Sequence, residues 1–118
     1  MIDKFSAKAK SIINYKRALV FIVRKKFKTK TYQGKIKRFS GYQNLFFFKA
    51  KGKDKIDLDF IVDKGYACLT VIQKKTMHII TEESCNKQIV LPIKKGWARF
   101  RLIGDKTNVN FLITRLKE

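Results

Sequence analysis

Turn-forming residues recur at short intervals from Lys55 onward and leave little room for a helix between them. The segments between these turns alternate apolar and polar side chains, the period of a half-buried strand. Glycine can supply the positive φ that such turns need. The expected turns and loops are 63–65, 82–87, 94–96 and 104–106, and the expected strands are 56–62, 67–72, 77–81, 88–93, 97–103 and 108–116. Turns at this pace predict antiparallel sheets in a sandwich or barrel.

Two further strands are expected upstream, over 32–39 and 42–50, around the turn residues Ser40 and Gly41. The second of them carries three consecutive phenylalanines at 46–48. In a strand, the middle ring points to the face opposite its neighbours. Large apolar groups on both faces predict that both faces are covered.

The N-terminal segment is the expected cover for the second face. As a helix over 2–27 it would carry an apolar stripe and an adjacent basic stripe. The competing interpretation ends the helix near Asn14 and makes 17–31 a strand, because valine, isoleucine, phenylalanine and threonine favour strands. We favour a helix over 3–15 and leave 18–30 open between helix and strand.

These patterns predict a mainly β fold. At 118 residues the chain is long enough for one domain with a core, and its hydrophobic content of 45% is too high for a disordered tail. The patterns 65–72 and 96–105 resemble a small jelly roll. We therefore expect a single domain over 1–118: a small antiparallel, jelly-roll-like β-sandwich over 31–118, with one N-terminal basic amphipathic helix and first strand in 1–30 packing on it.

The charge of the chain is strongly uneven. All sixteen charged side chains from Lys4 to Lys53 are Lys or Arg, whereas residues 54–118 carry twelve Lys or Arg against eight acids. Such a field attracts polyanions. Nucleic acid and an anionic membrane surface are both candidate partners, because both reward clustered cations. The expected anion-binding residues are Lys16, Arg17, Arg24, Lys25, Lys26, Lys28, Lys30, Lys35, Lys37 and Arg38.

Aromatic side chains near these cations form a second candidate feature. Tyr32 and Tyr42 are expected to be exposed more readily than the neighbouring phenylalanines, and nucleobases stack on such rings. Trp97, Arg99 and Arg101 alternate along one expected strand, so they share one face. A tryptophan between arginines could also stack on a sugar ring. The alternative function is therefore a carbohydrate- or small-ligand-binding sandwich whose charge serves solubility.

Catalysis has little support in the sequence. His78 is the single histidine, and no phosphate-binding glycine loop or nucleophile motif is present. We expect a non-catalytic binding module with no cofactor and no metal. Without an export signal the cytoplasm, or its membrane surface, is the expected location, and Cys68 and Cys85 are expected to be free thiols.

Overall fold

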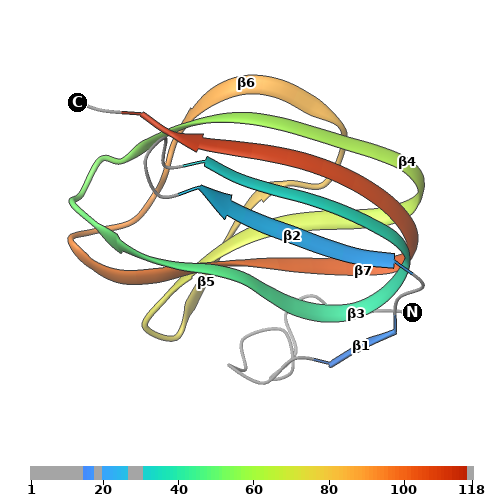
Figure 1. Ribbon diagram of the computed structural model, residues 1–118. Helices are drawn as coiled ribbons and strands as arrows, with labels where there is room; N and C mark the ends of the chain where they lie inside the picture. The colour runs from blue at the N-terminus through green and yellow to red at the C-terminus, as the bar shows by residue number, and fades with distance from the viewer. Residues whose placement is uncertain (1–14, 18–19, 27–30, 117–118) are drawn as a thin grey trace.

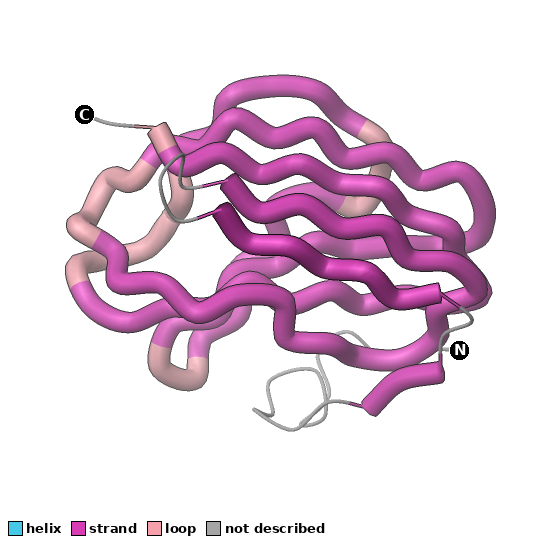
Figure 2. The backbone as a smooth tube through the Cα atoms, in the orientation of Figure 1, coloured by secondary structure: helices cyan, strands magenta, loops and turns pink. Residues whose placement is uncertain are grey.

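Seven strands make up the computed structural model, which describes residues 15–17, 20–26 and 31–116 (Figure 1). Within these ranges the structure contains no helix (Figure 2). None of the described residues therefore forms a helix that is long and apolar enough to cross a membrane. The strands are β1 (Tyr15–Arg17), β2 (Val20–Lys26), β3 (Thr31–Ala50), β4 (Lys55–Gln73), β5 (Thr76–Thr81), β6 (Cys85–Val90) and β7 (Gly96–Arg115).

All seven strands belong to one open antiparallel sheet. Its order is β1-β3-β7-β4-β5, while β2 pairs with β3 and β6 pairs with β4. The central strand β7 is hydrogen-bonded along its length to β3 on one side and to β4 on the other. The prediction of a mainly β, antiparallel single domain is confirmed, and the strands form one continuous sheet rather than separate sheets.

Three long strands bend together at one level of the sheet. The register of β3, β4 and β7 is interrupted at 36–41, 62–66 and 104–107, and these interruptions lie side by side. Bulges of this kind add a residue on one strand and bend it without ending the ladder. The turns predicted at 40–41, 63–65 and 104–106 are therefore bends inside continuous strands, because the flanking residues keep their hydrogen-bonded neighbours.

Gly65 shows why a glycine is needed at this bend. Its φ is +72°, and a Cβ at this position would collide with the backbone carbonyls of Asp105 and Lys106 on β7. A side chain would have to push two strands apart, since neither carbonyl can move alone. We call this level of the sheet the bend.

The bend folds the sheet over itself into two arms (Figure 1). The β2–β6 arm holds β2, β6 and the adjoining parts of the long strands, and the β1–β5 arm holds β1, β5 and the remaining parts. Side chains from the two arms meet in the core. Tyr32 of one arm lies 4.3 Å between ring centroids from Phe46 of the other, and Phe111 lies 6.2 Å from the same ring. The core therefore fills the space between two parts of one sheet.

The N-terminal predictions have a mixed outcome. A continuous helix over 2–27 is wrong, because Tyr15–Arg17 and Val20–Lys26 are strands paired with β3. The open question over 18–30 is settled as strand for 20–26, in keeping with its β-branched and aromatic residues. The favoured helix over 3–15 lies outside the described residues, apart from Tyr15, which begins β1.

One predicted loop is also corrected. The polar segment 82–87 was expected to be a loop, but β6 begins at Cys85 and pairs with β4 up to Val90. This strand is an edge strand whose polar side chains face solvent, so it lacks the apolar alternation that marks a covered strand. Residues 91–93, expected to end a strand, instead close the core with the buried side chains of Leu91 and Ile93.

Candidate anion-binding surface

Three connecting segments meet at the end of the molecule opposite the bend. They are the β3–β4 loop (51–54), the β4–β5 turn (74–75) and the segment 91–95 before β7. Ala50 pairs with Gly96, which brings the first and third segments together. The Gln73 side chain joins the second to the third: its Nε2 donates to the Lys94 carbonyl at 2.6 Å, and its Oε1 accepts from the Lys94 N–H at 2.9 Å.

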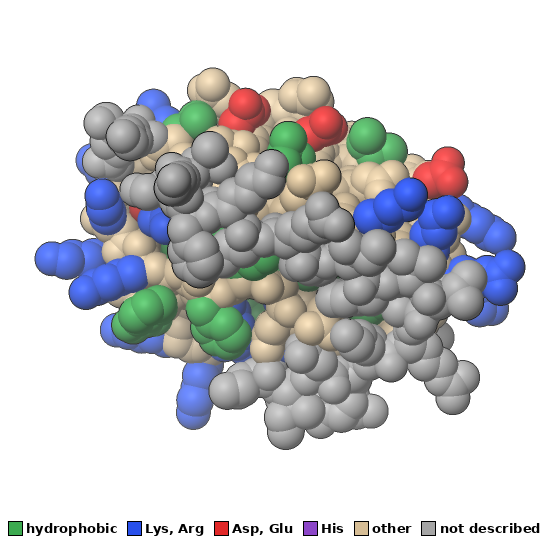
Figure 3. Space-filling model, in the orientation of Figure 1, with side chains coloured by type: hydrophobic (Ala, Val, Ile, Leu, Met, Phe, Trp, Pro, Cys, Tyr) green, Lys and Arg blue, Asp and Glu red, His purple; other side chains and the backbone are tan. Residues whose placement is uncertain are grey.

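Lysines are concentrated at this end, and all of them are exposed. Figure 3 shows Lys and Arg side chains gathered at the left end of the molecule, next to exposed hydrophobic side chains. The chain's sequence places them in the loops and at the neighbouring strand ends. We call these residues the lysine end: Lys49, Lys51, Lys53, Lys74, Lys75, Lys94 and Lys95.

Asp54 is the carboxylate of the β3–β4 loop, and it is engaged inside the protein. It is buried, and its two oxygens accept hydrogen bonds from the N–H groups of Lys51 and Gly52 at 3.0–3.2 Å. Its Oδ1 also lies 3.6 Å from Nη2 of Arg115. Asp54 therefore fixes the shape of the loop, and its charge is directed inward, away from the exposed lysines.

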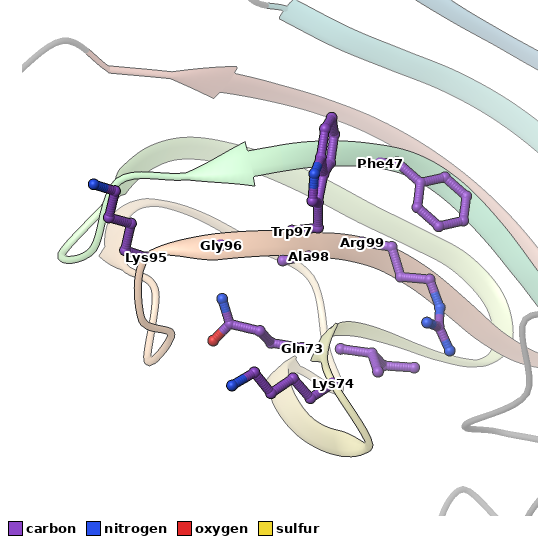
Figure 4. Close-up of a pocket in the computed structure, with 9 residues that line it drawn as sticks. Phe47, Gln73, Lys74, Lys95, Gly96, Trp97, Ala98 and Arg99 are labelled. Atoms are coloured by element: carbon purple, nitrogen blue, oxygen red, sulfur yellow. The ribbon is translucent and has the colours of Figure 1, made fainter.

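Two aromatic rings stand on the outer face of the β1–β5 arm beside the lysine end. Trp97 is 67% exposed and Phe47 is 50% exposed. They come from the neighbouring strands β7 and β3, with Trp97 opposite Lys49 and Phe47 opposite Arg99. Both rings border a hollow of about 350 Å³, which Lys74, Lys95 and Gln73 also line (Figure 4). We call it the Trp97 hollow.

The exposure of Phe47 corrects the prediction that both faces of the phenylalanine run are covered. Phe46 and Phe48 are buried in the core, and the Phe48 ring stacks on Phe100 with centroids 4.9 Å apart. Phe47 points to the opposite face, as alternation requires. That face is open at this position, so the ring contributes to the hollow instead of to a second core.

Trp97, Arg99 and Arg101 share one strand face, as predicted, but their surroundings differ. Arg99 is half-buried, and desolvation lowers the pKa of its guanidinium from the usual value. Arg101 is fully buried: its Nη1 donates to Asn44 Oδ1 at 2.6 Å, and its guanidinium carbon lies 5.8 Å from the centroid of the Tyr42 ring. The prediction of Arg101 as a contact residue is wrong, because this face is covered from that position toward the bend.

Both predicted contact tyrosines are buried. Tyr32 is 3% exposed because it faces the core against Phe46 and Phe100. Tyr42 is 7% exposed and clusters with Cys68 and Ile103 on the covered part of the outer face. Neither ring is available to stack on a partner. A single sequence could not show this, since the burial of each ring depends on contacts between distant strands.

The predicted cations fall into three groups. Lys28 and Lys30 lie outside the described residues. The second group lies on β1 and β2, each of which pairs with β3 in the described part of the sheet: Lys16, Arg17, Arg24, Lys25 and Lys26. Edge strands rich in lysine also resist pairing with other chains. The third group comprises Lys35, Lys37 and Arg38, which are exposed on β3 in the β2–β6 arm and near the bend.

All seven lysines of the lysine end were missed as binding residues. Among them, Lys94 and Lys95 were assigned to a turn, and Lys74 and Lys75 lay between two expected strands. The net charge of residues 54–118 is low, which hid their clustering. Two Lys-Lys pairs at alternate connections of a predicted antiparallel sheet were the available signal, since alternate connections of such a sheet lie at the same end.

Reactive groups are dispersed in the described part of the chain. Neither Cys68 nor Cys85 forms a disulfide, in agreement with the expectation of reduced thiols, and Cys68 is buried. No cluster of three or more His, Cys, Asp or Glu residues that could hold a metal ion occurs among the described residues.

Comparison with known proteins adds no family. The chain matches no protein-family model and no curated protein sequence.

Proposed function

We propose that this protein is a non-catalytic binding module that docks on an anionic partner through the lysine end. The observation that supports this most directly is that seven exposed lysines lie at one end of the molecule, whereas the single carboxylate of the three connecting segments is buried and hydrogen-bonded within its own loop. A lysine ammonium is a point charge with three donors on a flexible stem, so several of them adapt readily to phosphate or carboxylate groups.

This docking surface differs from the one expected from the sequence, whose cations all lie between Lys16 and Arg38. The cations of β1 and β2 extend the positive field along the edges of the sheet, while the lysine end concentrates it on three connecting segments. Release of counterions from a polyanion would supply most of the binding free energy. We further propose a cytoplasmic location.

For the fold we propose that the two arms correspond to the layers of a small β-sandwich of the jelly-roll-like kind, completed by a basic helix near the N-terminus. The packing of Tyr32 and Phe111 of one arm against Phe46 of the other supports a layered body.

A salt titration tests the docking proposal. We expect the protein to bind DNA, RNA or heparin near about 0.1 M salt, and the affinity for a single strand to fall with a slope of roughly −0.7 per phosphate contact. With four contacts, raising salt from about 50 to 200 mM weakens binding about 50-fold. Absence of binding to nucleic acid, heparin and anionic vesicles at about 0.1 M salt would exclude the proposal.

Two matched charge variants locate the surface. The first replaces four cations of the lysine end by glutamine: Lys51, Lys74, Lys94 and Lys95. The second makes the same change in charge near the bend: Lys37, Arg38, Lys64 and Lys106. We expect the first to weaken binding on the order of tenfold or more and the second to weaken it about twofold. Equal losses in both variants would mean that net charge alone, and not this surface, governs binding.

The exposed ring of Trp97 would suit the alternative function, a carbohydrate-binding module, but the rest of the hollow does not. Sugar hydroxyl groups need acceptors as well as donors. The described residues that line the Trp97 hollow include no carboxylate, and both polar atoms of the Gln73 amide are bonded to Lys94. The hollow is therefore poorly suited to a neutral sugar.

A further inference from the structure

We propose that the Trp97 hollow is a stacking site for the unpaired bases of single-stranded nucleic acid, with the lysine end holding the phosphates. This inference rests on the docking function proposed above and names its partner. Proteins that hold single strands combine a cationic track with aromatic rings on which bases stack. The hollow brings both features within one surface.

Trp97 and Phe47 differ from the other aromatic side chains that the structure describes. Most of these are buried in the core or in the Tyr42 cluster, and Tyr66 is half-buried. Leaving two large rings in water forgoes the free energy that burial would bring. Two such rings beside one another, bordered by cations, mark a surface that contacts a partner.

The positions of the two rings suit successive bases. Since Trp97 is opposite Lys49 and Phe47 is opposite Arg99, the two aromatic residues occupy diagonal positions on adjacent antiparallel strands. Diagonal positions are roughly 7–8 Å apart, within reach of large side chains. Figure 4 shows both rings on the same side of the sheet, with Lys74 and Lys95 at the border of the hollow. A strand that stacks on the rings would bring its phosphates to these lysines.

The chemistry of the hollow selects for a flat, anionic ligand. Its lining offers π faces and cations, while the Gln73 amide is occupied by Lys94. Every base has a π face, and stacking needs no hydrogen-bond acceptor from the protein. In a duplex the base faces are already stacked, so an unpaired strand is the form that fits.

A lipid surface fits less well. Both rings belong to strands, and the lysines lie in the loops and turn that continue past the strand ends. A flat bilayer would meet the charged loops before the rings, whereas interfacial proteins place aromatic groups where they can enter the headgroup region. A flexible single strand can follow the loops into the hollow.

The single tryptophan of the chain allows a direct test, since its fluorescence reports on the hollow alone. The protein is titrated with oligothymidylate of about 12 nucleotides and, separately, with inorganic polyphosphate of similar length. We expect both to bind, and only the oligothymidylate to quench Trp97 emission, because only it has bases. Equal emission with both ligands would overturn the stacking site while leaving the docking function intact.

Two variants measure the contribution of stacking. Binding of labelled oligothymidylate is followed by anisotropy, which does not need the tryptophan. We expect Trp97→Ala to weaken binding on the order of tenfold and Trp97→Phe to restore most of the loss. Leu112→Ala is the matched control, because Leu112 is an exposed apolar residue on the outer face of the other arm, and we expect it to change binding less than about twofold. An unchanged affinity in Trp97→Ala contradicts the proposal.

Two further outcomes identify other partners. Binding to phosphatidylserine vesicles with a blue shift of Trp97 emission, and no quenching by oligothymidylate, would replace the nucleic acid by a lipid surface. Failure of every polyanion to bind would exclude the docking function itself, and the stacking site with it.

Discussion

The two ends of the bent sheet differ in how their cations and acids are arranged. At the lysine end, seven lysines surround a loop whose carboxylate, Asp54, is buried. Near the bend, cations and acids are interspersed: Lys37, Arg38, Lys64 and Lys106 beside Asp63, Glu82, Glu83 and Asp105. Figure 3 shows both kinds of charge at the right end of the molecule.

This difference shows that the net charge of a sequence segment is a poor guide to the position of a docking surface. Interspersed charges of both signs largely cancel beyond a Debye length of about 10 Å, whereas a cluster of one sign keeps its field. The bend is also held together by hydrogen bonds between β3 and β7, such as Lys106 N–H to Ser40 Oγ at 3.0 Å and Arg38 N–H to Asn108 Oδ1 at 3.0 Å. The bend therefore serves structure, and the lysine end is available for a partner.

The largest expected effect concerns glycines at the two ends. Gly65→Ala at the bend would place a Cβ against the carbonyls of Asp105 and Lys106, in addition to the strain of its positive φ. We expect a loss on the order of 3 kcal/mol in the free energy of unfolding, measured with denaturant.

The matched control for that change is Gly52→Ala at the lysine end. Gly52 also has a positive φ, of +85°, but the nearest atom to its Cβ would be the Lys95 nitrogen at an ordinary 3.7 Å. We expect a loss of about 1 kcal/mol, from backbone strain alone. Equal losses at both positions would show that close packing of the strands at the bend contributes nothing.

The sequence predicts the strand content well because alternation and turn residues are local signals. It did not predict the bend, since a glycine is equally compatible with a turn between strands and with a bend within one strand, and this applies to Gly41, Gly65 and Gly104. Only the pairing of three distant segments decides between the two: Gly41 with Gly104, and Tyr66 with Asp105. Such non-local register is outside what one sequence reveals.

The candidate site was predicted in part. Alternation correctly placed Trp97 and Arg99 on one face, but the burial of Arg101 depends on what covers that face nearer the bend. The charge of the N-terminal half was read from a continuous run of cations. The lysine end is assembled from Lys49–Lys53 and two short pairs, and so it emerges only when the three connecting segments are brought together.

A smaller effect is expected when a lysine with a positive φ is replaced by glycine, a change that relieves backbone strain and removes a cation. Lys74 at the lysine end and Lys106 at the bend both have a positive φ, of 54° and 49°. A left-handed conformation costs a non-glycine residue about 1–2 kcal/mol, of which the greater flexibility of glycine in the unfolded chain offsets a part. We expect Lys74→Gly and Lys106→Gly each to raise the free energy of unfolding by about 0.5 kcal/mol.

Binding should distinguish the two variants although their stabilities match. Lys74→Gly removes a cation from the lysine end, and we expect about threefold weaker binding to oligothymidylate. Lys106→Gly removes one from a region of mixed charge, and we expect no measurable change. Weaker binding in both variants, or in neither, would contradict the assignment of the docking surface to one end. Affinity by anisotropy and stability by denaturant unfolding provide the two readings.

The last expected effect is a pH dependence that belongs to the bend. Burial first, then the neighbouring Cys68 and a hydrogen bond to Glu82 Oε2 at 3.0 Å, raise the pKa of the Tyr66 phenol above its usual value. The folded state thus favours the neutral phenol, and its stabilising contribution is complete below a pH of about 10, the pKa in the unfolded chain. As pH rises above this value the contribution is lost.

We expect Tyr66→Phe to be less stable than the natural chain at neutral pH by up to about 1 kcal/mol, and this difference in the free energy of unfolding to narrow above pH 10 or so. The lysines deprotonate in both proteins, so the difference between their unfolding curves isolates Tyr66, and a gap that stays constant through this range would show that its ionisation is not coupled to folding.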